Sequence, residues 1–209
     1  MKQEFVDASC NGVLGIYGGY AANAAMTERR FKAVATVVGA NFGRIMREGD
    51  QSPDAAIKAL EGICAQRTAE TKGSDGRGLH PLSSQRERES AGVHDVDMAE
   101  AIDYYMIQRD QKPGSPNKLS LTSTIAVYGW DALHLADKLL TQPLQIIVGG
   151  GQAGAFGSYR DGFELFNKAR SEKKSILVVP AATHYDLYDQ PGPVKQAVEK
   201  LKEFYGESL

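Results

Sequence analysis

The chain has 209 residues, of which 42% are hydrophobic and 24% are charged, a composition typical of a soluble globular protein. This composition excludes a disordered chain, a collagen and a small disulfide-stabilised protein. Because 24 basic residues are balanced by 26 acidic ones, the net charge of −2 gives no indication of a nucleic-acid partner.

The first half of the chain opens with a pattern of strand, glycine turn and helix. The apolar run Gly12–Ile16 predicts a buried strand, Gly18 and Gly19 predict a turn, and the alanine-rich stretch Tyr20–Arg30 predicts a helix. Ala33–Val38 is rich in β-branched residues and predicts a second strand, which ends at Gly39.

The pattern changes after Gly43, and we interpret residues 44–130 as a helical and loop insertion over the core. Ser52 and Pro53 predict a helix start, and Val96–Ile107 is amphipathic and predicts a helix capped by Asp95. The polar, charged stretch Thr71–Gly92 predicts an exposed loop.

The alternation of helices and strands returns after the insertion. Strands are expected at 144–148 and 175–179, and helices at 131–140, 158–170 and 193–205. Strands that alternate with helices imply a parallel sheet with flanking helices. The sequence therefore predicts a single α/β domain over residues 1–209, with function at the carboxyl ends of the strands.

Two features at those strand ends are typical of acyl chemistry. Gly15–Gly19 has the frame Gly-x-nucleophile-x-Gly of a nucleophile elbow, but its middle residue is Tyr17 in place of Ser or Cys. His184 follows the last strand, where a hydrolase of this architecture places its general base. Without the elbow, a histidine in such a loop is more simply a hydrogen-bonded structural residue.

Four segments resemble the α/β-hydrolase branch related to dienelactone hydrolase. These segments, which lie outside residues 44–130, are Gly12–Ile16, Gly19–Ala25, Thr27–Val37 and Thr183–Tyr188. The resemblance implies an α/β-hydrolase fold and an ancestral reaction in which an ester or thioester acyl group is hydrolysed or transferred. It starts at the fifth strand of the family, so it also implies that four strands are missing and that the fold is truncated.

The resemblance assigns site roles residue by residue. The nucleophile position falls on Tyr17, the base on His184 and one oxyanion donor on the backbone N–H of Gly18. The triad acid normally lies around Gly150–Gly154, where this chain has no carboxylate, and the first one downstream is Asp161. The second oxyanion donor belongs to the missing strands, so the resemblance predicts an impaired enzyme whose partner, if it is active, is a small acyl substrate.

Two other hypotheses remain open. A catalytically dead hydrolase homologue can serve as a binding or interaction protein. Alternatively, Gly149–Gly154 has the frame Gly-x-Gly-x-x-Gly of a nucleotide-binding loop, although neither the acidic residue expected about 20 positions later nor the surrounding pattern supports it. No Cys, His or Asp set has metal-ligand spacing, so the sequence predicts neither a metal nor another cofactor.

Cellular context and assembly can also be predicted. Met1–Glu4 is polar, unlike a secretory signal, and the apolar runs are shorter than the ~18 residues of a membrane helix. Cys10 and Cys64 are most simply reduced thiols, so we expect a cytoplasmic protein without a membrane partner. We also expect a homo-oligomer formed through the bare edge of strand Gly12–Ile16, and little loss of stability on replacing His184.

Overall fold

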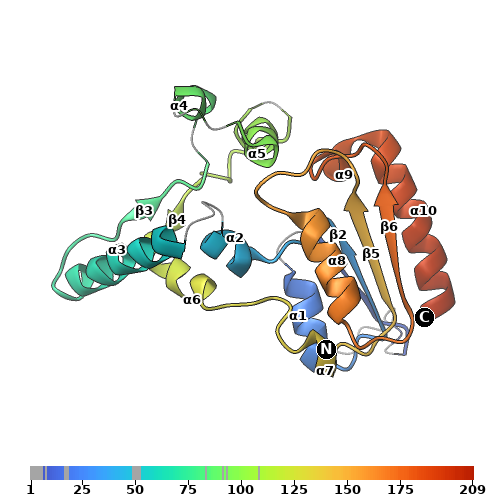
Figure 1. The fold of residues 1–209 in the computed structure, drawn as a ribbon. Helices are drawn as coiled ribbons and strands as arrows, with labels where there is room; N and C mark the ends of the chain where they lie inside the picture. Colours follow the sequence, from blue (N-terminus) through green and yellow to red (C-terminus); the bar gives the residue numbers. More distant parts are fainter. Residues whose placement is uncertain are drawn as a thin grey trace. The chain divides into compact units, whose positions relative to one another are not determined.

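The computed structural model describes residue 7 and residues 9–16, 19–48, 53–82, 84–90, 92, 94–107 and 109–209. The chain divides into two compact units (Figure 1). Unit 1 comprises residues 1–41, 132–153 and 157–209, and unit 2 comprises residues 42–131 and 154–156.

Unit 1 is built on a four-stranded parallel sheet. In the order of the sheet its strands are β1 (Gly12–Ile16), β2 (Ala33–Val37), β5 (Leu144–Gly149) and β6 (Lys174–Val179). All four predicted strands are therefore confirmed, and so is the α/β fold class with its parallel sheet and flanking helices.

The central strands are buried and the first strand is an edge. Every residue of β2 is buried, as an apolar β-branched run between two neighbours requires. Within the described sheet β1 pairs with β2 alone, in a register that places Gly15 opposite Thr36. Leu14 and Ile16 of this edge strand are 44% and 53% exposed, so the prediction that Gly12–Ile16 is buried was wrong, because within the described sheet the strand has a neighbour on one side only.

Helices cover both faces of this sheet (Figure 1). On one face, α8 packs against β5 and β6, and Gly162 lets it approach, because a Cβ atom there would lie 2.5 Å from Cγ1 of Val148. On the other face, Phe204 of α10 packs against Ala33 and Ala35 of β2. The helices of unit 1 are α1 (Tyr20–Thr27), α7 (Ala136–Leu139), α8 (Ser158–Lys168), α9 (Asp186–Asp189) and α10 (Pro191–Ser208).

Unit 2 is mainly helical, with a small antiparallel pair of strands. The side chain of Asp95 accepts a hydrogen bond of 2.9 Å from the backbone N–H of Met98, which confirms the predicted helix cap. In chain order the elements are α2 (Phe42–Glu48), α3 (Pro53–Thr71), β3 (Gly78–Leu79), α4 (Gln85–Ser90), α5 (Val96–Met106), β4 (Leu119–Ser120), the 3-10 helix η1 (Leu121–Thr124) and α6 (Ile125–Tyr128).

Two other local predictions were wrong. The stretch Thr71–Gly92 is not a continuous loop, because it contains β3 and α4. The expected helix at 131–140 forms only over Ala136–Leu139, because Leu135 takes the left-handed backbone conformation (φ 63°) and interrupts it. The predicted cap at Ser52 lies outside the described residues.

The insertion expected at 44–130 falls within unit 2, and its placement over the core stays a prediction. Among the described residues, no helix combines the length and the apolar character that a membrane crossing requires.

Candidate functional site

A short turn after β6 positions His184. The backbone N–H of Thr183 donates to Oδ2 of Asp186 (2.9 Å), and the backbone N–H of Asp186 donates to Oγ1 of Thr183 (3.2 Å). These reciprocal bonds fix the turn at the start of α9 in the manner of a capping box. His184 lies inside this turn and is only 4% exposed.

Both nitrogens of the His184 ring contact side-chain hydroxyls. Nδ1 lies 3.0 Å from Oγ of Ser158, and Nε2 lies 3.1 Å from the phenol oxygen of Tyr188. Ser158 is the first residue of α8, preceded by Gly157 with a positive φ of 58°. The imidazole is therefore held between a residue that follows β5 and one that follows β6.

Burial governs the protonation of this histidine. It lowers the pKa of His184 from 6.5 to about 4, because the charged imidazolium loses its hydration. The Tyr185 and Tyr188 rings contribute to this environment, with centroids 5.0 and 5.3 Å from that of His184. At neutral pH the imidazole is uncharged, which is the form a general base requires.

This burial does not agree with the expectation that His184 can be replaced at little cost. That expectation treated the residue as an ordinary loop position. A side chain that is 4% exposed and makes two hydrogen bonds contributes to packing and provides hydrogen-bond partners for the hydroxyl groups of Ser158 and Tyr188. We therefore expect its removal to destabilise the fold.

The glycine run after β5 packs against the segment that leads to His184. The backbone N–H of Gly150 donates to the carbonyl of Val179, and that of Gly151 donates to the carbonyl of Ala182, both at 2.8 Å. A Cβ atom at Gly149 would lie 2.4 Å from the Ala182 carbonyl oxygen. The glycines thus allow the backbone after β5 to pack closely against the backbone of residues 179–183. The N–H groups of Gly150 and Gly151 already donate to carbonyl groups, which argues against a phosphate-binding loop.

The proposed nucleophile and oxyanion positions, Tyr17 and Gly18, lie outside the described residues. The elements on either side fit the expected pattern, because β1 ends at Ile16 and α1 begins at Tyr20. Gly19, directly before α1, has a φ of 66°, a conformation that favours glycine. The roles of Tyr17 and Gly18 stay predictions.

Asp161 is buried in α8, where it is 2% exposed. Its Oδ2 accepts a hydrogen bond of 2.7 Å from the backbone N–H of Asn41, which follows β2. In turn, the side-chain oxygen of Asn41 accepts a bond of 3.1 Å from the backbone N–H of Ala132. Through these hydrogen bonds Asp161 stabilises the backbone that follows β2. Its assignment as triad acid stays a prediction.

Asp95, which the sequence interpretation identified only as a helix cap, and Asp97, which it missed, hold residues 154–156 within unit 2. Oδ2 of Asp97 accepts bonds from the backbone N–H groups of Gly154 (3.1 Å) and Phe156 (2.9 Å), and Oδ2 of Asp95 accepts one from Ala155 (2.7 Å). Burial raises the pKa of Asp97 to about 6. Acidic residues at a helix start are common, so nothing in the sequence singled out this pair.

The described residues contain no group of three or more His, Cys, Asp or Glu side chains that could hold a metal ion.

Comparisons with known proteins place the fold. No protein-family model matches the chain. The uncharacterized protein YcjY of Escherichia coli K12 is 35% identical over 209 residues, which cover 98% of this chain and 66% of YcjY. The uncharacterized protein PA2218 of Pseudomonas aeruginosa is 26% identical over 206 residues, which cover 95% of this chain and 52% of PA2218. The chain therefore spans between one half and two thirds of these relatives.

Solved structures are also similar to this chain. The crystal structure of PA2218 superposes with a TM-score of 0.84 and 25% identity, over 98% of this chain and 62% of that one. The structure of the alpha/beta hydrolase GrgF from Penicillium sp. sh18 superposes with a TM-score of 0.73 and 15% identity, over 97% of this chain and 65% of that one. The chain has an α/β-hydrolase fold. In this fold His184 follows the last strand, as the sequence interpretation placed it.

Proposed function

We propose that the chain is an acyl-group hydrolase or transferase of the dienelactone-hydrolase-related branch, acting on an ester or thioester, with His184 as its general base and with impaired turnover. The observation that carries this proposal is the buried, neutral imidazole of His184 after β6, held by Ser158 and Tyr188.

The impairment follows from the residues at the other positions of the site. A phenol at position 17 is a poor nucleophile for acyl transfer, because its reference pKa of about 10 leaves it protonated at neutral pH. The described hydrogen bond at Nδ1 of His184 joins it to the neutral hydroxyl of Ser158 and not to a carboxylate. A neutral partner orients the ring but gives less stabilisation to the imidazolium that forms when a base takes a proton.

Hydrolysis of p-nitrophenyl acetate and of a short acyl thioester tests the proposal. We expect slow turnover by the wild-type chain, above the rate in buffer, that falls to the background rate in His184→Gln. His134→Gln is a matched control, because His134 is exposed, and it should retain the wild-type rate. Equal rates in wild type and His184→Gln would remove the role of His184 as a base.

The second candidate function is a binding or interaction protein derived from a hydrolase. It is favoured by Tyr17 at the nucleophile position and by the absence of a carboxylate from Gly150–Gly154. Complete absence of turnover with both substrates would support it. We retain the cytoplasm as the proposed location, in keeping with the free thiols of Cys10 and Cys64.

A further inference from the structure

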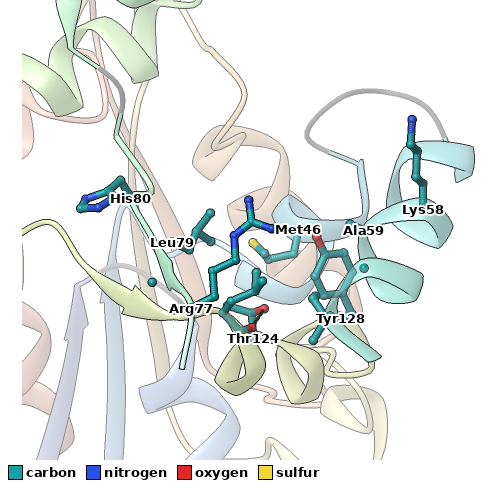
Figure 2. Close-up of a pocket in the computed structure, with 12 residues that line it drawn as sticks. Met46, Lys58, Ala59, Arg77, Leu79, His80, Thr124 and Tyr128 are labelled. Carbon is teal, nitrogen blue, oxygen red and sulfur yellow. Dashed lines mark hydrogen bonds between the residues drawn. The ribbon is translucent and has the colours of Figure 1, made fainter. Parts of the chain in front are cut away.

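Unit 2 contains a cavity of about 450 Å³, a volume within the range of small-molecule sites (Figure 2). It lies among α2, α3, β3, η1 and α6, all of which belong to unit 2. Its walls are mainly apolar and include Met46, Ile63, Leu79, Leu121 and Tyr128. Ile63 is 3% exposed, so the cavity reaches down to the core of this unit.

Basic side chains line this cavity. Lys58, Arg77 and His80 line it, and no lining residue is acidic. Figure 2 shows the Arg77 guanidinium extending toward Met46 and Tyr128, whereas Lys58 and His80 extend away on either side. In the part of the chain that the structure describes, no carboxylate forms an ion pair with Arg77. Nδ1 of His80 is already 2.9 Å from the carbonyl oxygen of Asn117.

We propose that this cavity binds a small organic carboxylate, with the carboxylate paired to Arg77 and an apolar body against Met46, Leu79 and Tyr128. A guanidinium presents a planar set of donors that matches a carboxylate in a two-point contact. Apolar walls favour a ligand that buries hydrocarbon and disfavour a small, fully hydrated anion. The combination of the exposed Arg77 guanidinium with such walls therefore selects an aliphatic or aromatic monocarboxylate.

Gly62 supplies an independent way to test the cavity. It lines the cavity from α3, and a Cβ atom there would meet no other atom within 4 Å. A larger side chain at this position has room and is also a better helix former than glycine. Gly62→Leu should therefore fill part of the cavity without unfolding the helix.

The experiment is a titration of the full chain with octanoate, followed by NMR chemical shifts and by calorimetry, with 1-octanol and inorganic phosphate as comparison probes. We expect saturable octanoate binding, with weaker binding of 1-octanol and of phosphate. Arg77→Gln should weaken octanoate binding about 10-fold or more, since a charge-assisted contact is lost. Gly62→Leu should weaken it as well.

Arg86→Gln is the matched control, because Arg86 is an exposed arginine of α4 outside the cavity, and it should bind octanoate as the wild type does. Thermal unfolding of each variant confirms that it is folded. Absence of saturable octanoate binding would overturn the proposal. So would equal binding of 1-octanol, or octanoate affinity unchanged in both Arg77→Gln and Gly62→Leu. These are binding measurements, so their outcome is independent of the acyl-hydrolysis assay.

Discussion

Oγ of Ser158 lies 3.0 Å from Nδ1 of His184, the nitrogen that a carboxylate holds in a Ser-His-Asp triad. A hydroxyl at this place fixes the direction of the ring without adding a negative charge. The main effect on the pKa of His184 is therefore burial, which lowers it to about 4. At Nδ1 the described contact therefore orients the ring through a neutral hydroxyl.

Ser158→Asp should supply that support. An ionised carboxylate next to Nδ1 favours the imidazolium, so we expect the pKa of His184 to rise by about one unit or more. Ser158→Asn is the matched control, because it has a similar size and no charge, and it should leave the pKa close to the wild-type value. NMR titration of the histidine ring measures both. Equal pKa values in the two variants would show that residue 158 does not face His184 in solution.

His184 should make the stability of the fold depend on pH. Its pKa is about 4 in the folded chain against 6.5 as the reference value, so the unfolded chain binds the proton more tightly. The stability contributed by the neutral ring is full above about pH 6.5 and is lost as the pH falls through 4. The loss is on the order of 3 kcal/mol.

The comparison with His184→Gln isolates this effect from other titrating groups. At pH 7 we expect the variant to be about 1–3 kcal/mol less stable than wild type, because buried partners lose their hydrogen bonds. The gap should shrink between pH 6.5 and 4.5, as urea unfolding at each pH will measure. The exposed His134→Gln should show no such change. A gap that is the same at every pH would mean that His184 is not buried as neutral imidazole.

Asp97 should have the opposite pH dependence. Its pKa is raised from 3.8 to about 6 by burial, so the folded chain binds the proton more tightly and the stability it contributes is lost as the pH rises through 6. Asp97→Asn removes the buried charge and keeps an oxygen acceptor for the N–H groups of Gly154 and Phe156. Relative to wild type, its unfolding free energy should therefore increase as the pH rises from 4 to 7.

Asp97→Ala serves as the contrast, because it leaves both N–H groups without this acceptor. Relative to Asp97→Asn, we expect it to lose about 1–3 kcal/mol for each unsatisfied group, at all pH values. Denaturant unfolding of the two variants at pH 4.5 and 7.5 separates charge from hydrogen bonding. If Asp97→Asn and Asp97→Ala have the same unfolding free energy, the hydrogen bonds from Asp97 to residues 154–156 contribute little to stability.

The sheet was predictable from the sequence and the surroundings of His184 were not. Apolar runs rich in β-branched residues, each followed by glycine or a turn, identified β1, β2, β5 and β6, because that pattern is local. The partners of His184 come from α8 and α9, and their contact depends on how both helices pack. Ser158 gave no local signal, because a serine at a helix start is ordinary. Likewise, nothing in the sequence indicated the left-handed conformation of Leu135 that shortens α7.

The edge strand β1 should mediate self-association of this chain. It pairs with β2 on one side within the described sheet, and Leu14 and Ile16 are exposed along it. Unpaired backbone groups beside apolar side chains offer a template for a second copy. We expect a dimer or larger species at tens of micromolar by light scattering, and less of it in Ile16→Lys.

Val198→Lys is the control for this substitution, since Val198 is 41% exposed and belongs to α10 and not to the strand. It adds the same charge and should leave the association unchanged. A monodisperse wild-type monomer at these concentrations would contradict the prediction. If both lysine variants weakened self-association equally, the cause would be the change in net charge and not the edge of β1.

Tyr17→Ser and Tyr17→Cys should not restore useful hydrolysis by themselves. Either change supplies a nucleophile, but the members of a catalytic triad act as a unit. The hydroxyl of Ser158 stands where an acid would hold His184, and the described bond of Asp161 runs to Asn41.

We therefore expect a trace of burst acylation without sustained turnover in Tyr17→Ser. Steady-state hydrolysis of a short-chain p-nitrophenyl ester by wild type, Tyr17→Ser and Tyr17→Ser/His184→Ala measures it. Tyr17→Ser/Ser158→Asp adds a carboxylate beside Nδ1 and should exceed Tyr17→Ser, because the added charge stabilises the imidazolium formed during attack. If Tyr17→Ser alone turned over at ordinary enzyme rates and its His184→Ala partner did not, the chain would hold a complete site, and the impairment would lie in Tyr17 alone.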